Sequence, residues 1–267
     1  MTGGLLTGLT LWESCIIPFL LNNASSWVQL KKKDMDKLSK LQNYFLNTLL
    51  NTFNCPIPIM YLDLDILSIQ SRILKEKLLF FHHICSLPQE SLAYQVLKVQ
   101  KQYHFPSLYD DISHFLIEHE IVDVKNYSKA EWKTFVKMKV KEADRNFFLE
   151  SSKKYKKLDH ASLALEEEGI KDYFLNLDVA GARIRFKERS LCMSYCKSHY
   201  SLAEENLLSM FCSFCPQEEY VENLSHWRRC LGYSQFPRSR DLSIEADLIS
   251  YYQDIIQFRK MELDSNV

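Results

Sequence analysis

The sequence predicts an all-α protein, and three features of its 267 residues support this fold class. Apolar residues recur at helical spacing through most of the first 120 residues. Glycine occurs 6 times and proline 7 times, which favours long helices over tight turns. The composition is 46% hydrophobic and 25% charged, as in ordinary globular proteins with a buried core. The net charge of -1 gives no global attraction to nucleic acid, so any basic surface must be local.

The N-terminal segment, residues 1–28, contains an apolar stretch from Leu11 to Leu21. This stretch lacks a basic n-region and includes Glu13 and Pro18, so we expect a buried helix rather than a signal peptide or a membrane span. The chain has 8 cysteines and no secretory signal. We therefore expect metal ligands and buried thiols in a reducing compartment. The protein would then be intracellular, nuclear or cytoplasmic, with no membrane partner.

Four helices are expected up to residue 120, each with an amphipathic stripe that is typical of core packing. Asp34 or Asp36 would cap the first helix. The segment Pro56–Pro58 would break the chain, and Pro88 and Pro106 would end the second and third helices. The four stripes consist of Leu38, Leu41, Phe45 and Leu49; Ile66, Ile69, Ile73, Phe80 and Ile84; Leu92, Val96, Val99 and Tyr103; and Leu108, Ile112 and Phe115.

Residues 121–160 differ from the preceding region because they contain eleven Lys or Arg and six Asp or Glu. Four of the basic residues follow one another at steps of four and would share one face of a helix. They are Lys133, Lys137, Lys141 and Arg145. Such a face suits contacts with the phosphates of RNA or DNA. A solvated helix surface without a partner would give the same pattern, so both interpretations stay open.

A second basic run follows the acidic segment Ala164–Glu168 and Gly169, which would break a helix. It includes Arg183 and Arg185, which we count as further candidate phosphate contacts. The alternation of basic and apolar residues here is compatible with a strand and equally with a helix.

The most specific motif is a cluster of cysteine and histidine residues near the C-terminus. Cys212 and Cys215 have the spacing of a knuckle in which two thiolates converge on one ion. After ten further residues, His226 and Cys230 are four apart and would lie on one helical face. Three thiolates and an imidazole leave no open position, so we expect a structural Zn²⁺ site. The alternative is a set of buried, reduced side chains without a metal. Downstream, residues 244–255 read as a closing amphipathic helix.

Pairs of acidic residues elsewhere do not have the pattern of a catalytic centre. Asp110 and Asp111 stand at the expected start of a helix, where acids are favoured without any metal. Asp63 and Asp65 precede an expected helix, so we expect them to act as caps.

The histidines outside the zinc motif also fail to match metal-binding patterns. His114 and His119 are five apart, whereas a zinc protease motif requires a separation of four. We expect the pair His82–His83 to be partly exposed. Three further residues could be ligands of a second metal ion, but no fourth ligand is evident: Cys192, Cys196 and His199.

Several segments carry a resemblance when they are taken in order along the chain. They are Leu11–Ala24 followed by Trp27, Leu41–Phe45, Arg72–His83, Ser91–Ala93, and Ala182–Arg189 leading into the cysteine and histidine cluster. Over nearly the whole chain, this ordered set resembles the region after the palm in reverse transcriptases of non-LTR (LINE-type) retrotransposons. The resemblance implies a helical thumb-like region and a zinc-binding module, which would grip template and primer in an RNA-directed DNA polymerase. It also implies that the palm, with its catalytic aspartates, is not in this chain.

The expected organisation is a thumb-like helical region, a basic helical connector, a CCHC zinc-binding module, and a C-terminal helix with a tail. Their boundaries are residues 1–120, 121–190, 191–235 and 236–267.

We expect a non-catalytic chain that binds RNA or DNA through the basic helix face and the zinc module. The module would present three residues to a single strand: Trp227, Arg228 and Arg229. Trp227 would either stack on a base or shield the zinc site as a core aromatic. The palm of a parent polymerase would be a further partner. The alternatives are a protein-interaction module with purely structural zinc and a relic whose helices have lost their partner surface.

Overall fold

The computed structural model describes residues 4–52, 55–103, 106–155 and 168–190, together with residues 253–255, 257 and 261. The chain divides into two compact units, each assembled from segments that are distant in sequence. Unit 1 consists of the described residues of Met1–Leu9, Leu46–Asp65 and Ser151–Val267, and unit 2 consists of those of Thr10–Phe45 and Ile66–Glu150.

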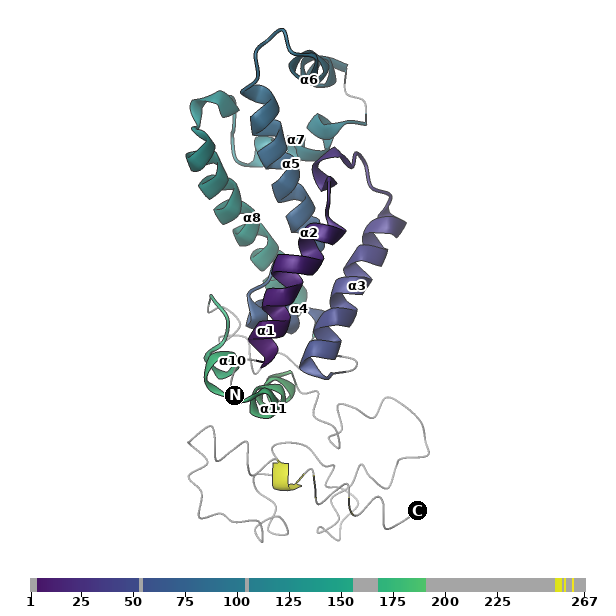
Figure 1. The fold of residues 1–267 in the computed structure, drawn as a ribbon, viewed down its shortest axis with the longest axis vertical. Coiled ribbons are helices and arrows are strands. Elements are labelled where there is room, and N and C mark those ends of the chain that lie inside the picture. Colours follow the sequence, from purple (N-terminus) through teal and green to yellow (C-terminus); the bar gives the residue numbers. More distant parts are fainter. Residues whose placement is uncertain are drawn as a thin grey trace. The chain divides into compact units, whose positions relative to one another are not determined.

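The all-α prediction is confirmed for the described residues, which form helices and turns and no strand (Figure 1). The segment around Arg183, for which strand and helix were both open, is helical. The helices are α1 (Gly4–Leu11), a π-helical turn (Trp12–Ile16), α2 (Ile17–Leu20), α3 (Lys32–Leu50), α4 (Ile57–Leu64), α5 (Ile69–Cys85), α6 (Leu92–Tyr103), α7 (Leu108–Glu118), α8 (Lys129–Ser152), α10 (Asp172–Asn176) and α11 (Val179–Arg189). Short 3-10 turns occur at Ala24–Ser26 and Val124–Asn126.

The described part of the chain contains no bilayer-spanning helix, because none of its helices combines the necessary length with sufficient apolar character. The apolar N-terminal stretch is helical, as expected, but it is buried along one side only. Trp12 and Ile17 are buried, whereas Leu11 and Phe19 are exposed.

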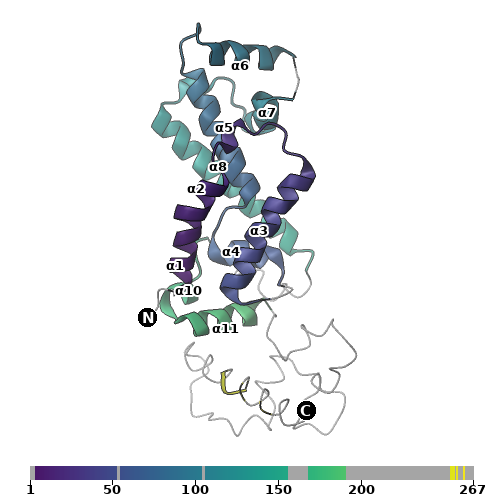
Figure 2. The ribbon, with the colours of Figure 1, turned by 45° about the vertical axis from the view of Figure 1, so that its right-hand side comes forward.

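Unit 2 is organised around α5, which packs against α6, α7 and both 3-10 turns. Figure 2 shows α6 crossing the end of α5 beside α7. The first half of α5 buries Ile69 and Ile73 in a cluster with Trp12, which stacks on Phe45 at a centroid distance of 4.3 Å. The second half contributes to a larger cluster with α6, α7 and α8, whose members include Leu78, Phe81, Leu97, Ile112, Phe115, Trp132, Val136 and Val140.

The helix boundaries agree with the sequence in part. Pro88 and Pro106 follow the ends of α5 and α6, as predicted. Pro58, in contrast, lies in the first turn of α4 and does not interrupt the chain. This position suits proline, because the amide hydrogen that it lacks has no partner at a helix start. The capping prediction for Asp34 and Asp36 is wrong, since α3 already begins at Lys32.

The amphipathic stripes predicted for the core differ in their outcome. The α7 stripe is buried, as expected. In α3 the most buried positions are Gln42, Leu46 and Leu50, one residue further along than the predicted stripe. In α6 the prediction is wrong, because the four stripe residues are exposed and Leu97 is the buried one.

Unit 1 contains a buried carboxylate, that of Asp63, for which the sequence predicted a capping role. The capping prediction for Asp63 and Asp65 is wrong: α5 is capped by Ser68. Asp63 lies inside α4, where its side chain is fully buried, and Asp65 is the left-handed residue that ends that helix. The Asp63 carboxylate accepts hydrogen bonds from the Tyr173 hydroxyl at 2.7 Å and from Arg189 Nε at 3.0 Å. This arrangement links α4 with α10 and α11.

The expectation for the pair His82–His83 holds for one residue only. His83 is exposed, but His82 is buried and stacks on Trp132 at a centroid distance of 5.8 Å. A ring nitrogen of His82, Nε2, lies 3.0 Å from the carbonyl oxygen of Tyr127. His82 therefore belongs to the packing of unit 2.

Candidate nucleic-acid interface

The basic stripe predicted on residues 133–145 lies on α8, a single helix of 24 residues. Each of its four members directly follows a buried residue in the sequence: Lys133, Lys137, Lys141 and Arg145 follow Trp132, Val136, Val140 and Asp144. One residue corresponds to a rotation of about 100° around a helix. The basic stripe therefore runs parallel to the buried stripe, along the flank of the helix.

The four basic residues differ in how far they extend into solvent. Lys133 and Lys137 are exposed, and within the described residues no ion pair involves either of them. Lys141 and Arg145 are half-buried and make interactions of their own. The N-terminal half of the stripe is thus the part that is most accessible to a ligand.

Trp132 fixes the rotation of α8 near its N-terminus. Its indole ring is buried in the core of unit 2, and Nε1 donates a hydrogen bond of 2.9 Å to the carbonyl oxygen of Leu78. Rings of His82, Tyr127 and Phe135 pack around the indole at centroid distances between 5.5 and 5.8 Å. A rotation of α8 would break the contacts with Leu78, His82 and Tyr127, which lie outside this helix.

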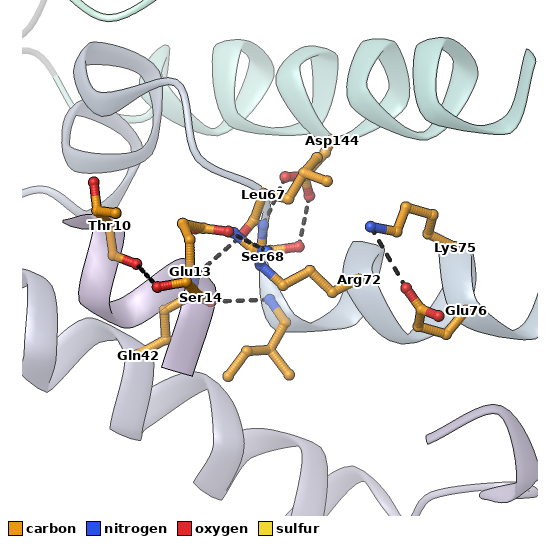
Figure 3. Close-up of polar contacts among 11 residues, drawn as sticks. Thr10, Glu13, Ser14, Gln42, Leu67, Ser68, Arg72, Lys75, Glu76 and Asp144 are labelled. Carbon is orange, nitrogen blue, oxygen red and sulfur yellow. Dashed lines mark hydrogen bonds and ion pairs between the residues drawn. The ribbon is translucent and has the colours of Figure 1, made fainter. Parts of the chain in front are cut away.

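Asp144 fixes the rotation of α8 further along the helix. Figure 3 shows its carboxylate pointing toward Ser68 at the start of α5. The carboxylate accepts hydrogen bonds from the backbone amide and hydroxyl of Ser68, at 2.8 and 2.6 Å, and from the hydroxyl of Ser71 at 2.6 Å. Because the start of a helix carries unpaired amide hydrogens and a partial positive charge, a carboxylate is favoured there.

Two further side chains complete this polar cluster around residues 67–72. The side-chain amide of Gln42 donates to the carbonyl oxygen of Leu67 and accepts from the amide of Ile69. The guanidinium of Arg72 donates to both carboxylate oxygens of Glu13 (Figure 3). The π-helical turn, α3, α5 and α8 are therefore connected at one point, which holds the basic stripe on a rigid support.

Three acidic residues of α8, Glu131, Glu142 and Asp144, lie away from the exposed part of the basic stripe. Asp144 is buried and engaged with α5. Glu131 accepts a hydrogen bond from the amide of Ser128, and the two Ser128 hydrogen bonds lower the pKa of Glu131. Glu142 accepts from Lys139 at 2.8 Å, and this contact lowers the pKa of Glu142. On a helical wheel, Glu131 and Glu142 fall on the side away from Lys133.

The second pair of candidate residues, Arg183 and Arg185, lies on α11 in unit 1. Arg183 is half-buried, and its Nε donates to the carbonyl oxygen of Leu49 at 2.9 Å. Arg185 lines a cavity of about 460 Å³ with Lys171, Tyr173 and Arg189. Arg183 is therefore held by the body of unit 1, whereas Arg185 lies at the wall of this cavity.

The acidic pair at the start of α7 has structural partners. Asp111 accepts from the Lys77 ammonium at 2.6 Å and from the backbone amide of Gln29 at 3.1 Å. Asp110 accepts from the side-chain amide of Gln29. In the described residues, no group of three or more His, Cys, Asp or Glu has the geometry of a metal site. The pair therefore closes a contact within unit 2, as its place at a helix start suggested.

The zinc prediction falls outside the part of the chain that the structure describes. This applies to the four candidate ligands, to the adjacent aromatic and basic residues, and to the second candidate group: Cys212, Cys215, His226 and Cys230; Trp227, Arg228 and Arg229; and Cys192, Cys196 and His199.

Sequence reasoning missed the two buried carboxylates that organise the units, Asp63 and Asp144. One signal for Asp144 was available: it follows Trp132, Val136 and Val140 at steps of four, so it falls on the apolar face of the helix. For Asp63 the apolar run on both sides was such a signal, because an acid in a buried helix needs a partner. Neither signal identifies the partner, since the partners are 76 and 126 residues away.

The chain matches no family model, and it has no match among curated proteins or solved structures. Function therefore rests on the chemistry of the site.

Proposed function

We propose that this chain is a non-catalytic nucleic-acid-binding protein that contacts phosphates through the basic stripe of α8. The observation that carries this proposal is the pair of exposed lysines, Lys133 and Lys137, one turn apart on a helix whose rotation is fixed by Trp132 and Asp144. Cations carried by a fixed helix require less ordering of the backbone on binding than cations on a mobile loop.

The dimensions of the stripe suit a nucleic-acid backbone. At a rise of ~1.5 Å per residue, the stripe from Lys133 to Arg145 is about 18 Å long. Each strand of duplex DNA carries one phosphate per ~3.4 Å of axis, so several phosphates fit along this length. The contacts would be with phosphates only, and we therefore expect little sequence preference.

The proposal extends to the zinc module and to the family resemblance. Cys212, Cys215, His226 and Cys230 would hold a structural Zn²⁺, next to the candidate base-stacking residue Trp227. Together with the helical thumb-like region, this module would act beside the palm of a parent polymerase of the retrotransposon type. The chain alone would not extend a primer, because such chemistry requires metal-binding carboxylates on a rigid scaffold.

The decisive experiment compares two charge-matched double variants of the full chain. In the first, Lys133→Gln and Lys137→Gln remove the exposed lysines of the stripe. In the second, Lys40→Gln and Lys98→Gln remove two exposed lysines from α3 and α6. Fluorescence anisotropy would measure binding of single-stranded RNA and DNA oligonucleotides at several salt concentrations.

The stripe variant should bind all sequences more weakly, and its salt slope should fall by up to about 1.4, because each lost phosphate contact on a single strand removes about 0.7. The control variant should keep the slope of the unaltered chain. Absence of binding by the folded unaltered chain, or equal slopes for both variants, would contradict the proposal.

The proposed zinc site is tested separately. Cys215→Ser should release bound Zn²⁺, which a metal indicator would detect, and should unfold the surrounding module, because metal binding and folding are coupled in small zinc modules. A chain that holds no zinc after expression in zinc-supplemented medium would contradict this part of the proposal and leave the α8 part standing.

A protein-interaction module is the second candidate function, and one observation favours it. Four apolar residues on α6 are exposed although they are spaced as a packing stripe. Binding of another protein through such a surface would not depend on salt in the way that phosphate contacts do.

A further inference from the structure

Helix α6 has two faces with different roles. Leu97 is buried, and the Lys101 ammonium lies over the rings of Phe81 and Tyr109 at 5.2 and 5.6 Å from their centroids. These contacts attach one side of α6 to α5 and α7. The other side carries a second apolar stripe, the α6 seam, which consists of Leu92, Val96, Val99 and Tyr103.

The α6 seam is open to solvent in the described structure. Leu92 is 80% exposed and Tyr103 is 63% exposed, while Val96 and Val99 are each 45% exposed. The spacing of the four residues is four, three and four, which is the a/d repeat of a helix that packs against another helix. On a helical wheel the seam lies about 140° from Leu97, so one helix can hold the body and a partner at the same time.

We propose that the α6 seam pairs with the α6 seam of a second copy of this chain, in an antiparallel arrangement. The seam is symmetric about the midpoint between Leu97 and Lys98. A two-fold axis through this midpoint places Leu92 of each copy opposite Tyr103 of the other, and Val96 opposite Val99. The larger side chains then form the outer layers and the valines form the inner layers. Each pairing occurs twice, as a two-fold, self-complementary interface requires.

The charge distribution favours a second copy as the occupant. The positions that flank the seam are uncharged: Ala93, Gln95, Gln100 and Gln102. Flanking charges normally determine which helices pair, and identical charged flanks repel each other. Neutral flanks allow two copies to meet without this repulsion. The net charge of -1 adds little repulsion between whole chains.

The size of the seam predicts a weak dimer. From Leu92 to Tyr103 the seam is about 17 Å long at ~1.5 Å per residue. A pair of seams of this length buries less than the roughly 1,200 Å² that stable specific interfaces need. Association should therefore depend on protein concentration.

Sedimentation of the full chain over a hundredfold range of concentration tests this inference. Val96→Lys/Val99→Lys should abolish dimer formation, because it places four ammonium groups at the centre of the interface. It should leave the helix intact, since lysine has a higher helix propensity than valine and both sites are solvent-accessible. The matched control is Ile117→Lys/Val122→Lys, which makes the same change at two exposed aliphatic residues outside the seam and should dimerise like the unaltered chain.

A third variant, Val96→Glu/Val99→Lys, reports the orientation of the helices. Antiparallel pairing brings each glutamate opposite a lysine, so this variant should dimerise more strongly than Val96→Lys/Val99→Lys. Parallel pairing brings like charges together, and equal loss in both variants would overturn the antiparallel arrangement. A chain that stays monomeric at every concentration, or a seam variant that dimerises as well as the control, would overturn the proposal as a whole.

Discussion

Two buried aspartates, one in each unit, satisfy their hydrogen-bonding capacity in different ways. Asp144 in unit 2 lies against the first turn of α5 and accepts from neutral donors of Ser68 and Ser71. Asp63 in unit 1 lies in the last turn of α4 and accepts from the Tyr173 hydroxyl and from the Arg189 guanidinium.

The difference follows from the helix ends at which the two carboxylates lie. A helix N-terminus presents free amide hydrogens and a partial positive charge, so neutral donors are sufficient for Asp144. A helix C-terminus presents carbonyl oxygens and a partial negative charge, which disfavour another anion. Asp63 therefore needs a cation, and Arg189 supplies it.

The largest expected effect is the loss of that cation. Arg189→Met should lower the free energy of unfolding by about 3–5 kcal/mol, because it leaves the fully buried Asp63 carboxylate without its countercharge. Urea denaturation followed by circular dichroism would measure this change.

The matched control for Arg189→Met is Arg183→Met, which removes a half-buried arginine that donates to the carbonyl oxygen of Leu49. Its cost should be smaller, about 1 kcal/mol. The double variant Asp63→Leu/Arg189→Met should recover part of the lost stability, because it removes both charges but leaves the buried Tyr173 hydroxyl without its acceptor. Equal decreases in the free energy of unfolding for Arg189→Met and Arg183→Met would contradict this explanation of the two helix ends.

A smaller effect is expected for Asp144→Asn in unit 2. The amide keeps the size of the carboxylate but turns one acceptor into a donor that faces other donors, so the cost should be about 1.5–3 kcal/mol. Denaturation of this variant should be compared with that of Glu142→Gln, an exposed neutralisation on the same helix, which should change stability little. A cost above that of Arg189→Met would show that the position on the helix does not explain the difference.

The contact between Tyr173 and Asp63 can be tested through the pH dependence of stability in Tyr173→Phe. Burial, and then the adjacent Asp63 carboxylate, raise the pKa of Tyr173 well above its usual value of about 10. The folded state therefore retains a proton that the unfolded state loses. The stabilisation from this group is complete below about pH 10 and falls as the pH rises further.

Near neutral pH, Tyr173→Phe should cost about 1.5 kcal/mol, the value for one hydrogen bond to a charged group. Between about pH 9 and pH 11, its stability should fall less steeply than that of the unaltered chain. Tyr44→Phe, at an exposed tyrosine, is the control and should keep the original pH dependence. Identical alkaline profiles for Tyr173→Phe and the unaltered chain would argue against a buried, neutral hydroxyl beside Asp63.

The smallest expected effect concerns an exposed carboxylate at a helix start. Glu131 and Ser128 exchange hydrogen bonds at the beginning of α8, and those from Ser128 lower the pKa of Glu131. The resulting stabilisation is present above the unfolded-state pKa and is lost as the pH falls through the lower folded-state value.

Glu131→Ala should give a slight decrease in the thermal midpoint near neutral pH, and this decrease should shrink as the pH falls and the carboxyl group becomes protonated. Glu131→Gln keeps an acceptor oxygen and serves as the control, with a smaller change near neutral pH. A decrease for Glu131→Ala that is equally large in acid would mean that the charge at the helix start does not contribute.

Much of the fold was predictable from local patterns. The all-α class, the helical stripe of α7 and the shared face of Lys133, Lys137 and Lys141 follow from a period of 3.6 residues. The caps and the burial of individual stripes were less predictable. The α6 seam shows the reason: periodicity indicates that apolar residues lie on one side of a helix, but it does not indicate whether another element covers that side.

Helix formation depends on residues within about one turn of each other. The sequence by itself therefore determines the helices and the basic stripe of α8. The two carboxylate sites depend on contacts across 76 and 126 residues. Which helix end each carboxylate meets, and whether Arg189 or Ser68 is its partner, follows from how the helices pack. The tertiary structure alone decides these partners, because a buried charge is stabilised by whatever surrounds it in space.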